Sequence, residues 1–308
     1  MRSLHVLTLA LAFVVVVLGA YVRLSDAGLG CPDWPLCYGR PLPAEIADSD
    51  ALAKAWKEMG HRYLAGTLGV LIVLLVVLAW RTRRARSTAS ATLALVVLQA
   101  TLGAWTVTML LKPAIVTAHL LGGMATLALL TWLTLEQLRF SPARDASRLR
   151  VPGAIALAAL AVQIALGGWV SSNYAALACP DLPLCTGELV PPMDFRNAFH
   201  VVRELGQTPQ GELLSREALL AIHWTHRVFA LVVLALVGWV AYRTLSFSRV
   251  LALTLALLVA VQFSLGVANV AVSRPLPLAA AHNAGAALLV ISLIVLNFFA
   301  FRALRPPS

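Results

Sequence analysis

Lys57-Glu58-Met59-Gly60-His61-Arg62 stands at the start of a long apolar run, and the other motifs of the chain can be placed relative to it. A carboxylate three residues before a histidine lies on nearly the same face of a helix. The second half of the chain repeats the pattern as His223-Trp224-Thr225-His226-Arg227, with a histidine in place of the carboxylate. Charged side chains are costly in hydrocarbon, so two His-Arg pairs opening two apolar helices indicate a site rather than chance.

Apolar runs of membrane-spanning length recur along the chain. It has 308 residues, of which 60% are hydrophobic and only 12% are charged, which is too apolar for an ordinary soluble domain. Uncharged runs long enough to cross a bilayer lie near 3–22, 63–80, 87–111, 113–135, 151–173, 228–242 (with a histidine-bearing start near 218), 250–273 and 275–301. We therefore predict an all-α integral membrane protein with eight transmembrane helices.

The net charge of +10 is concentrated beside every second span. The basic residues there are Arg81, Arg83, Arg84, Arg86, Arg139, Arg144, Arg148, Arg150, Arg243, Arg249, Arg302 and Arg305. By the positive-inside rule these segments and both termini face the cytoplasm, so the charge does not indicate nucleic-acid binding. The first run continues into Tyr21-Val22-Arg23 without a small-residue cleavage site, so we expect it to be retained as a span. The loops after the odd-numbered spans are then expected on the outer face.

The chain is an internal duplication. Leu18-Gly19 and Leu166-Gly167 are each followed, twelve residues after the glycine, by a Cys-Pro-Asp-x-Pro-Leu-Cys motif. Gln99, Leu102-Gly103 and Ala118-His119 recur as Gln262, Leu265-Gly266 and Ala281-His282. Such self-similarity predicts two tandem pseudo-symmetric four-helix bundles, residues 1–140 and 141–308.

The four cysteines form two pairs, Cys31/Cys37 and Cys179/Cys185, in loops that the topology places on the outer face. Disulfides form and persist there, so we expect Cys31–Cys37 and Cys179–Cys185 bonds. Unpaired loop thiols are the alternative. A metal site is less expected, because no histidine stands beside the cysteines at finger-like spacing.

Four histidines are expected to share one layer near the outer surface. Helix rise places His61, His119, His226 and His282 about 25–30 Å from the cytoplasmic boundary. Each half supplies one from its second span and one from its fourth, and two imidazoles facing across a bundle are the usual ligands of a six-coordinate haem. The alternative is that these histidines only make hydrogen bonds between helices.

Arginines follow the histidines of the second span in each half. Arg62 and Arg227 are candidates to pair with haem propionates at the membrane surface. The alternative is that they extend to the interface without a partner. We expect His200 to be solvated in the long second outer loop and His223 to have a local polar role.

Nearly the whole chain resembles the heme A synthase family, bacterial and mitochondrial. The resemblance rests on the paired-cysteine outer loop, Glu58-x-x-His61-Arg62, the two Ala-His motifs and the duplication. It implies that the N-terminal half receives heme O between His61 and His119, and that the C-terminal half holds a resident haem b between His226 and His282. It further implies that the C8 methyl of heme O is oxidised to a formyl group, yielding heme A for terminal oxidases.

The resemblance assigns Glu58 to a position near that methyl and links Cys31 and Cys37 to activity. A carboxylate at the membrane edge can carry protons or stabilise positive charge developing on carbon. The plainer interpretation of Glu58 is an acid favoured by the N-terminal end of a helix dipole. Expected partners are heme O, heme O synthase, cytochrome oxidase assembly factors, the lipid bilayer and an electron acceptor whose nature the sequence leaves open.

Two other functions are compatible with a polytopic membrane protein, but the shared outer layer of the four histidines disfavours the first, and the small number of polar residues in the spans disfavours the second. A di-haem b-type electron-transfer cytochrome shares the four histidines but needs no Glu58, and it usually stacks its haems on opposite sides of the membrane. A transporter with parallel repeats needs polar residues at mid-bilayer, where Gln99, Gln163 and Gln262 are the main candidates. A prenyl transferase is disfavoured by the lack of an Asp-rich magnesium-diphosphate motif.

Overall fold

The computed structural model describes residues 2–43, 46, 48–138 and 144–302, which are helical apart from connecting loops and contain no strand. The helices are α1 (Arg2–Leu24), α2 (Ser49–Thr82), α3 (Arg86–Thr108), α4 (Pro113–Gln137), α5 (Arg150–Ser172), the short α6 (Phe195–Ala198), α7 (Arg216–Thr244), α8 (Arg249–Ala271) and α9 (Leu276–Arg302). Two 3-10 turns, Arg144–Leu149 and Ala175–Leu177, precede and follow α5.

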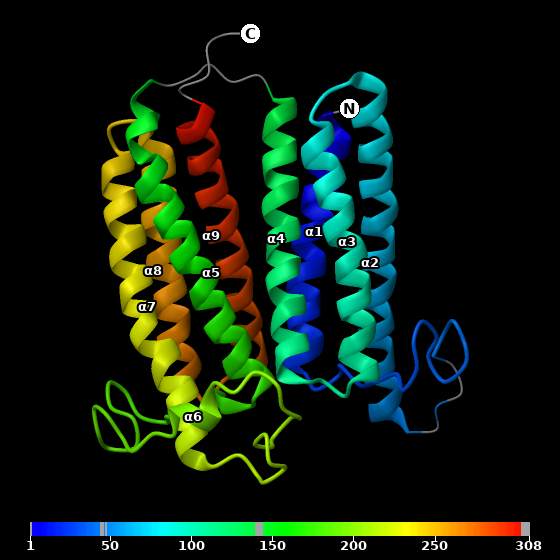
Figure 1. The fold of residues 1–308 in the computed structure, drawn as a ribbon, viewed down its shortest axis with the longest axis vertical. Coiled ribbons are helices and arrows are strands. Elements are labelled where there is room, and N and C mark those ends of the chain that lie inside the picture. Colours follow the sequence, from blue (N-terminus) through cyan, green and yellow to red (C-terminus); the bar gives the residue numbers. More distant parts are fainter. Residues whose placement is uncertain (1, 44–45, 47, 139–143, 303–308) are drawn as a thin grey trace.

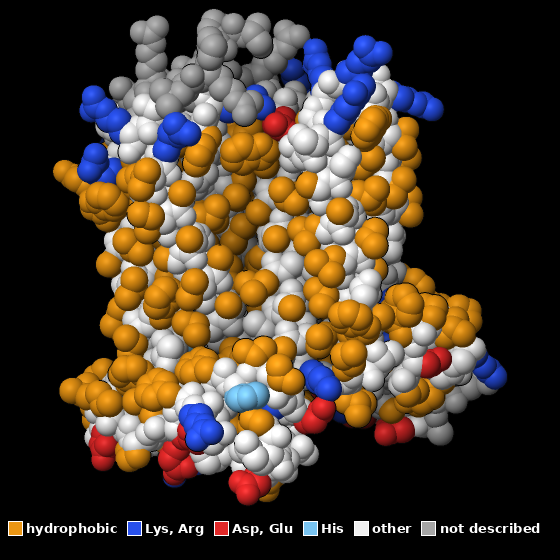
Figure 2. Space-filling view, in the orientation of Figure 1, with side chains coloured by type: hydrophobic (Ala, Val, Ile, Leu, Met, Phe, Trp, Pro, Cys, Tyr) orange, Lys and Arg blue, Asp and Glu red, His pale blue; other side chains and the backbone are white. Residues whose placement is uncertain are grey.

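Eight of these helices are long and apolar enough to cross a membrane, which confirms the predicted number of spans. The face shown in Figure 2 carries its charged side chains near the two ends, with hydrophobic side chains along the length between them. A polypeptide that crosses hydrocarbon must form its backbone hydrogen bonds internally, and an α-helix does this without a neighbouring segment.

Helix α2 begins earlier than the hydropathy indicated. Asp48 caps it by accepting the backbone N–H of Asp50 at 2.9 Å, and Asp50 pairs with Lys54 one turn later at 2.8 Å. The 34 residues of α2 measure roughly 50 Å at ~1.5 Å per residue, longer than a ~30 Å hydrocarbon core. The polar first turns therefore extend beyond the apolar run and carry Glu58 and His61 on one continuous helix.

The eight spans form two groups of four that stand side by side (Figure 1). In the first group α1 and α3 each pack against both α2 and α4. In the second group α5 and α8 each pack against both α7 and α9. The arrangement is compatible with two tandem four-helix halves. The boundary that we predicted between residues 140 and 141 lies outside the described residues.

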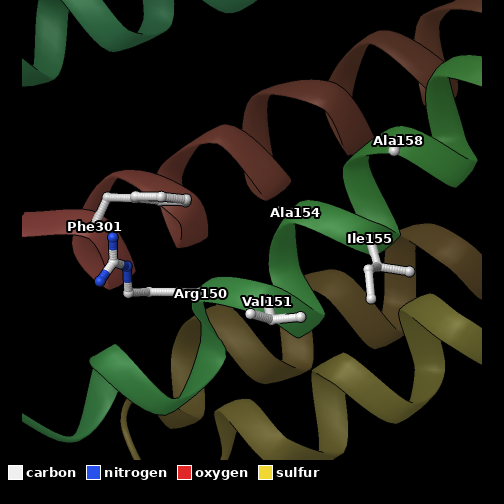
Figure 3. Close-up of a pocket in the computed structure, with 6 residues that line it drawn as sticks. All are labelled: Arg150, Val151, Ala154, Ile155, Ala158 and Phe301. Carbon is white, nitrogen blue, oxygen red and sulfur yellow. The ribbon is translucent and has the colours of Figure 1, made fainter.

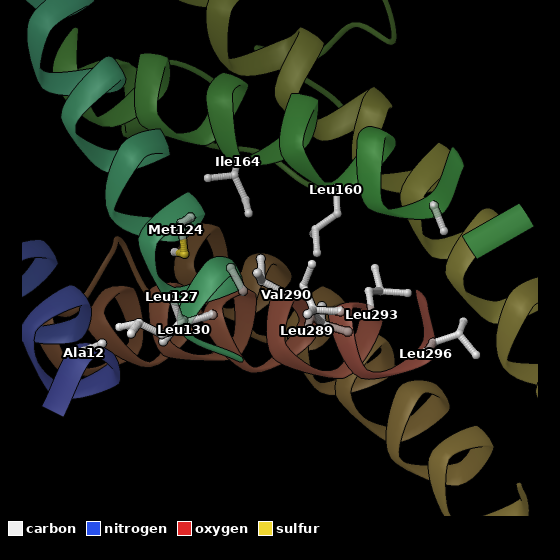
Figure 4. Close-up of a cluster of buried hydrophobic side chains, with 14 of the residues drawn as sticks. Ala12, Met124, Leu127, Leu130, Leu160, Ile164, Leu289, Val290, Leu293 and Leu296 are labelled. Carbon is white, nitrogen blue, oxygen red and sulfur yellow. The ribbon is translucent and has the colours of Figure 1, made fainter. Parts of the chain in front are cut away.

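The two groups share one apolar core. Helix α4 packs against α5 and α9, and α1 packs against α9. Leu127 and Leu130 of α4 are buried with Leu289 and Leu293 of α9 in this core (Figure 4). Tight packing of this kind, rather than water exclusion, holds helices together in a bilayer.

Polar links join the two groups at both ends of the bundle. The hydroxyls of Thr117 in α4 and Ser172 in α5 lie 3.2 Å apart. At the other end, Arg302 of α9 pairs with Glu136 of α4 at 3.2 Å.

The start of α1 and the end of α9 lie at one end of the bundle, and the cysteine loops lie at the other (Figure 1). This is the relative placement that the charge pattern predicts. Which end faces the cytoplasm stays a prediction, and Arg139 and Arg305 lie outside the described residues.

Candidate functional site

Each candidate ligand of the first half packs against a glycine of a neighbouring helix. A Cβ atom placed on Gly19 of α1 would lie 2.9 Å from Cε1 of His61 in α2. A Cβ atom on Gly103 of α3 would lie 3.3 Å from Cε1 of His119 in α4. The first distance is shorter than real Cβ contacts and the second is tighter than most of them, so a side chain at either glycine would press on the imidazole.

The second half repeats these contacts. A Cβ atom on Gly167 of α5 would lie 3.0 Å from Cε1 of His226 in α7, and one on Gly266 of α8 would lie 3.3 Å from Cε1 of His282 in α9. The glycines belong to the four Leu-Gly pairs that mark the repeat, at 18–19, 102–103, 166–167 and 265–266. The repeat was visible in the sequence, but the partner of each glycine was not.

The histidines of each half come from helices that lie diagonally across their bundle. His61 and His119 are close enough to interact electrostatically, and so are His226 and His282. The Nδ1 atoms of His61, His119 and His282 are buried, with no hydrogen-bond partner among the described residues. Paired imidazoles beside small residues fit the requirements of a flat, six-coordinate haem in each half.

Glu58 is 4% exposed and has two partners. Its Oε2 accepts the backbone N–H of Cys31 at 3.0 Å, and its Oε1 forms an ion pair with Arg62. Burial of a carboxylate is tolerated when charge and hydrogen bonds compensate for lost water. Glu58 is therefore held beside the first disulfide loop and one turn from His61.

His223 takes the place of Glu58 in the second half. It is 4% exposed, and its Nδ1 accepts the backbone N–H of Cys179 at 3.2 Å. The two residues thus perform the same structural task, which is to hold the first cysteine of each loop. This contact gives His223 the local polar role that we predicted. Only the first half has a carboxylate at this position.

The two arginines hold the disulfide loops. Arg62 donates through Nη1 to the carbonyl oxygens of Asp33 at 3.0 Å and Leu36 at 2.9 Å. Arg227 donates through Nη2 to the carbonyl oxygen of Asp181 at 2.8 Å, while its buried Nη1 has no partner among the described residues. Pairing of either arginine with a haem propionate stays a prediction.

Both cysteine pairs are disulfide-bonded, with Cα atoms 4.8 Å apart for Cys31–Cys37 and 4.6 Å for Cys179–Cys185. The aspartate of each motif closes its loop. Asp33 accepts the backbone N–H groups of Tyr38 at 2.7 Å and Gly39 at 2.8 Å. Asp181 likewise accepts the backbone N–H of Gly187 at 3.0 Å.

We expect thiol alkylation of membranes to label none of the four cysteines before reduction and all four after it. The sulfurs are bonded in pairs, and the cysteines are 0–2% exposed. Intact mass before and after reduction gives the count. Labelling of native membranes without a reductant would contradict the pairing.

The long second outer loop reaches the first half. Glu204 pairs with Lys112, at the start of α4, at 2.7 Å. Its neighbour Arg203 is 6% exposed and donates to Oδ1 of Asn173 at 2.5 Å, and burial lowers the pKa of its guanidinium. His200 is exposed, as expected.

A separate groove of about 380 Å³ opens between α5 and α9, at the end of the bundle away from the cysteine loops. Figure 3 shows the Arg150 guanidinium beside the ring of Phe301, 4.8 Å from its centroid. The residues that line the groove include none of the four candidate ligands. The groove is therefore not part of the histidine sites.

Comparison with known proteins confirms the resemblance noted in the sequence. Residues 2–294 match the Cytochrome oxidase assembly protein family, COX15-CtaA. The chain is 42% identical to the heme A synthase of Shewanella oneidensis, covering 95% of this chain and 94% of that protein. It is 30% identical to the heme A synthase of Halalkalibacterium halodurans, covering 91% of each. The chain belongs to the Cytochrome oxidase assembly protein family.

Proposed function

We propose that this chain is a heme A synthase, an oxidoreductase that converts the C8 methyl of heme O, through a hydroxymethyl group, to the formyl group of heme A. The match to the Shewanella oneidensis protein over nearly the whole chain carries the proposal. The two facing histidine pairs and their four glycines support it, because they suit one haem in each half. The product would serve terminal oxidases.

We assign the substrate to the N-terminal half and a resident haem b to the C-terminal half. His61 and His119 would bind the iron of heme O, and His226 and His282 that of haem b. Only the first half has a carboxylate beside its histidine, because His223 replaces Glu58 in the second. When bound, haem b would supply one-electron redox chemistry next to the substrate half.

Glu58 is the candidate catalytic residue. Its ion pair with Arg62 and its hydrogen bond from Cys31 fix the carboxylate one turn from His61. A carboxylate held in place needs little reorganisation to stabilise positive charge at an oxidised methyl carbon or to accept its proton. Arg62 acts through Glu58 and the loop, as a positioning residue.

We place the protein in the inner membrane of a bacterium, with both termini in the cytoplasm and the disulfide loops outside. The basic residues beside every second span support this orientation. Heme O synthase would supply the substrate, and cytochrome oxidase assembly factors would receive the product. The electron acceptor has no assignment, and nucleic acid is not among the partners.

The deciding experiment is reversed-phase analysis of haems from cells that make heme O, with and without this protein. We expect heme A or its hydroxymethyl precursor only in cells that contain the protein. Haem b bound to the protein, with heme O left unchanged in cells known to support the reaction, would favour the di-haem b-type electron-transfer cytochrome instead.

We expect Gly167→Leu to lower the haem content of the C-terminal half. A side chain there would press on the His226 imidazole, and overpacking of this kind costs about 1–3 kcal/mol, or roughly ten- to hundred-fold in affinity. The haem-to-protein ratio measures the loss. Gly238→Leu is the matched control, because a Cβ atom at Gly238 meets nothing within 4 Å. Equal haem content in the two variants would contradict the close contact at Gly167.

A further inference from the structure

We propose that Gln163 is a positioning residue for His226, and that it makes the C-terminal half the site that retains its haem. The proposal rests on the proposed function, which puts haem b between His226 and His282. Gln163 accepts the Nδ1 proton of the His226 imidazole, fixing the ring and increasing its donation to iron. The N-terminal half has no such group at the corresponding position and is therefore suited to exchange its haem as substrate and product.

Gln163 contacts both the ring and the backbone of His226. It lies in α5, one turn before Gly167, and Gly167 packs against the same imidazole. Its Nε2 is 3.2 Å from Nδ1 of His226 and donates to the His226 carbonyl oxygen at 3.1 Å. Its Oε1 is buried with no hydrogen-bond partner among the described residues. One side-chain amide thus touches the ring nitrogen and holds an unused acceptor.

Iron binding determines which atom of the amide faces the ring. An imidazole that binds iron through Nε2 carries its proton on Nδ1, so Nδ1 then needs an acceptor. Rotation of the Gln163 amide about its last bond exchanges nitrogen and oxygen and supplies that acceptor, and it gives up the hydrogen bond from Nε2 to the His226 carbonyl oxygen. A hydrogen bond of this kind orients the ligand and raises its basicity, which favours the ferric form and lowers the midpoint potential.

The internal repeat shows that only the C-terminal half has a glutamine at this position. Leu166-Gly167 corresponds to Leu18-Gly19, so Gln163 corresponds to Val15. Val15 is buried and has no polar atom in its side chain, and Nδ1 of His61 has no hydrogen-bond partner among the described residues. Gln99 and Gln262 match each other across the repeat, so residue type at this pair of positions does not distinguish the halves, although Nε2 of Gln262 also lies 3.3 Å from Nε2 of His282.

The test compares purified wild-type protein with Gln163→Leu and Gln163→Glu. Spectroelectrochemical titration gives the midpoint potential, and transfer of haem to excess apomyoglobin gives the rate of loss. We expect Gln163→Leu to shift the potential of the C-terminal haem to more positive values and to speed its loss roughly ten- to hundred-fold. Gln163→Glu, with a stronger acceptor, should shift the potential to more negative values. Val162→Leu, a change at a neighbouring side chain that is 47% exposed, should alter neither value.

Retained haem with an unchanged potential and rate of loss in Gln163→Leu would overturn the proposal. If Gln163→Leu does not assemble, the sign of the shift in Gln163→Glu decides, and a positive or absent shift overturns it. The reciprocal variant, Val15→Gln, should slow haem loss from the N-terminal half. Failure of the proposed haem site can be told apart from failure of the Gln163 proposal. In the first case, the low-spin haem signal of the wild-type protein would remain in His226→Ala.

Discussion

Replacement of His226 by alanine is expected to remove the low-spin haem signal of the C-terminal half, and replacement of His282 is expected to do the same. Each change deletes one of the two histidines that we propose as iron ligands, and the imidazole that remains cannot form a six-coordinate site by itself. The loss should be complete at ordinary haem concentrations, whereas substitutions on the lipid-facing surface should have no effect. Absorbance and electron paramagnetic resonance spectra of the purified protein measure it.

His223 and His200 provide controls for these variants. His223 is bonded to the backbone of Cys179, and His200 is exposed in the outer loop. Alanine at either position should leave the haem spectrum in place. An unchanged spectrum in His226→Ala would instead show that the resident haem is bound elsewhere.

Glu58→Gln is expected to stop heme A formation while haem binding is kept. The amide retains the size of the carboxylate and an oxygen that can accept the Cys31 N–H, but it removes the charge and the proton acceptor. General acid–base groups contribute about 10²- to 10⁴-fold in rate, so product should fall by at least ~100-fold. Reversed-phase analysis gives the product, and the absorbance spectrum gives the haem content.

Glu58→Ala separates the chemical role from the structural one. It removes both the charge and the contact with Cys31, so the first disulfide loop should also become easier to reduce. If Glu58→Gln kept a full yield of heme A and only Glu58→Ala lowered it, the carboxylate would serve to hold the loop. The catalytic assignment would then be wrong.

The spans could be predicted because bilayer thickness demands long uncharged runs, and these are local features of the sequence. The early start of α2 could not be predicted from hydropathy. It depends on the cap by Asp48 and the Asp50–Lys54 pair, which lie before the apolar run. Hydropathy places such polar turns in a loop. Two indications were available: the helical spacing from Ala51 to Met59, and a capping signal in which Asp48 precedes helix-favouring residues.

The candidate ligands could be selected by spacing and repetition, but their surroundings could not. In the sequence, Arg62 is interpreted as a charge at the membrane surface. Only the folded loop shows that it binds the Asp33 and Leu36 carbonyl groups. The glycine contacts join different helices, so no periodicity within one helix reveals them. Gln163 aligns with Val15 in the repeat, so a search for residues that match between the two halves does not select it.

The packing of α1 against α9 has a consequence for how the protein is made. Chains enter the membrane from the N-terminus, so the first helix to emerge meets this neighbour only when the last one has inserted. Until then lipid covers that side of α1 at little cost, because acyl chains are as apolar as the missing partner. Assembly of the bundle is thus completed by its final helix, and a chain truncated before Leu276 would insert but remain open along the seam between its halves.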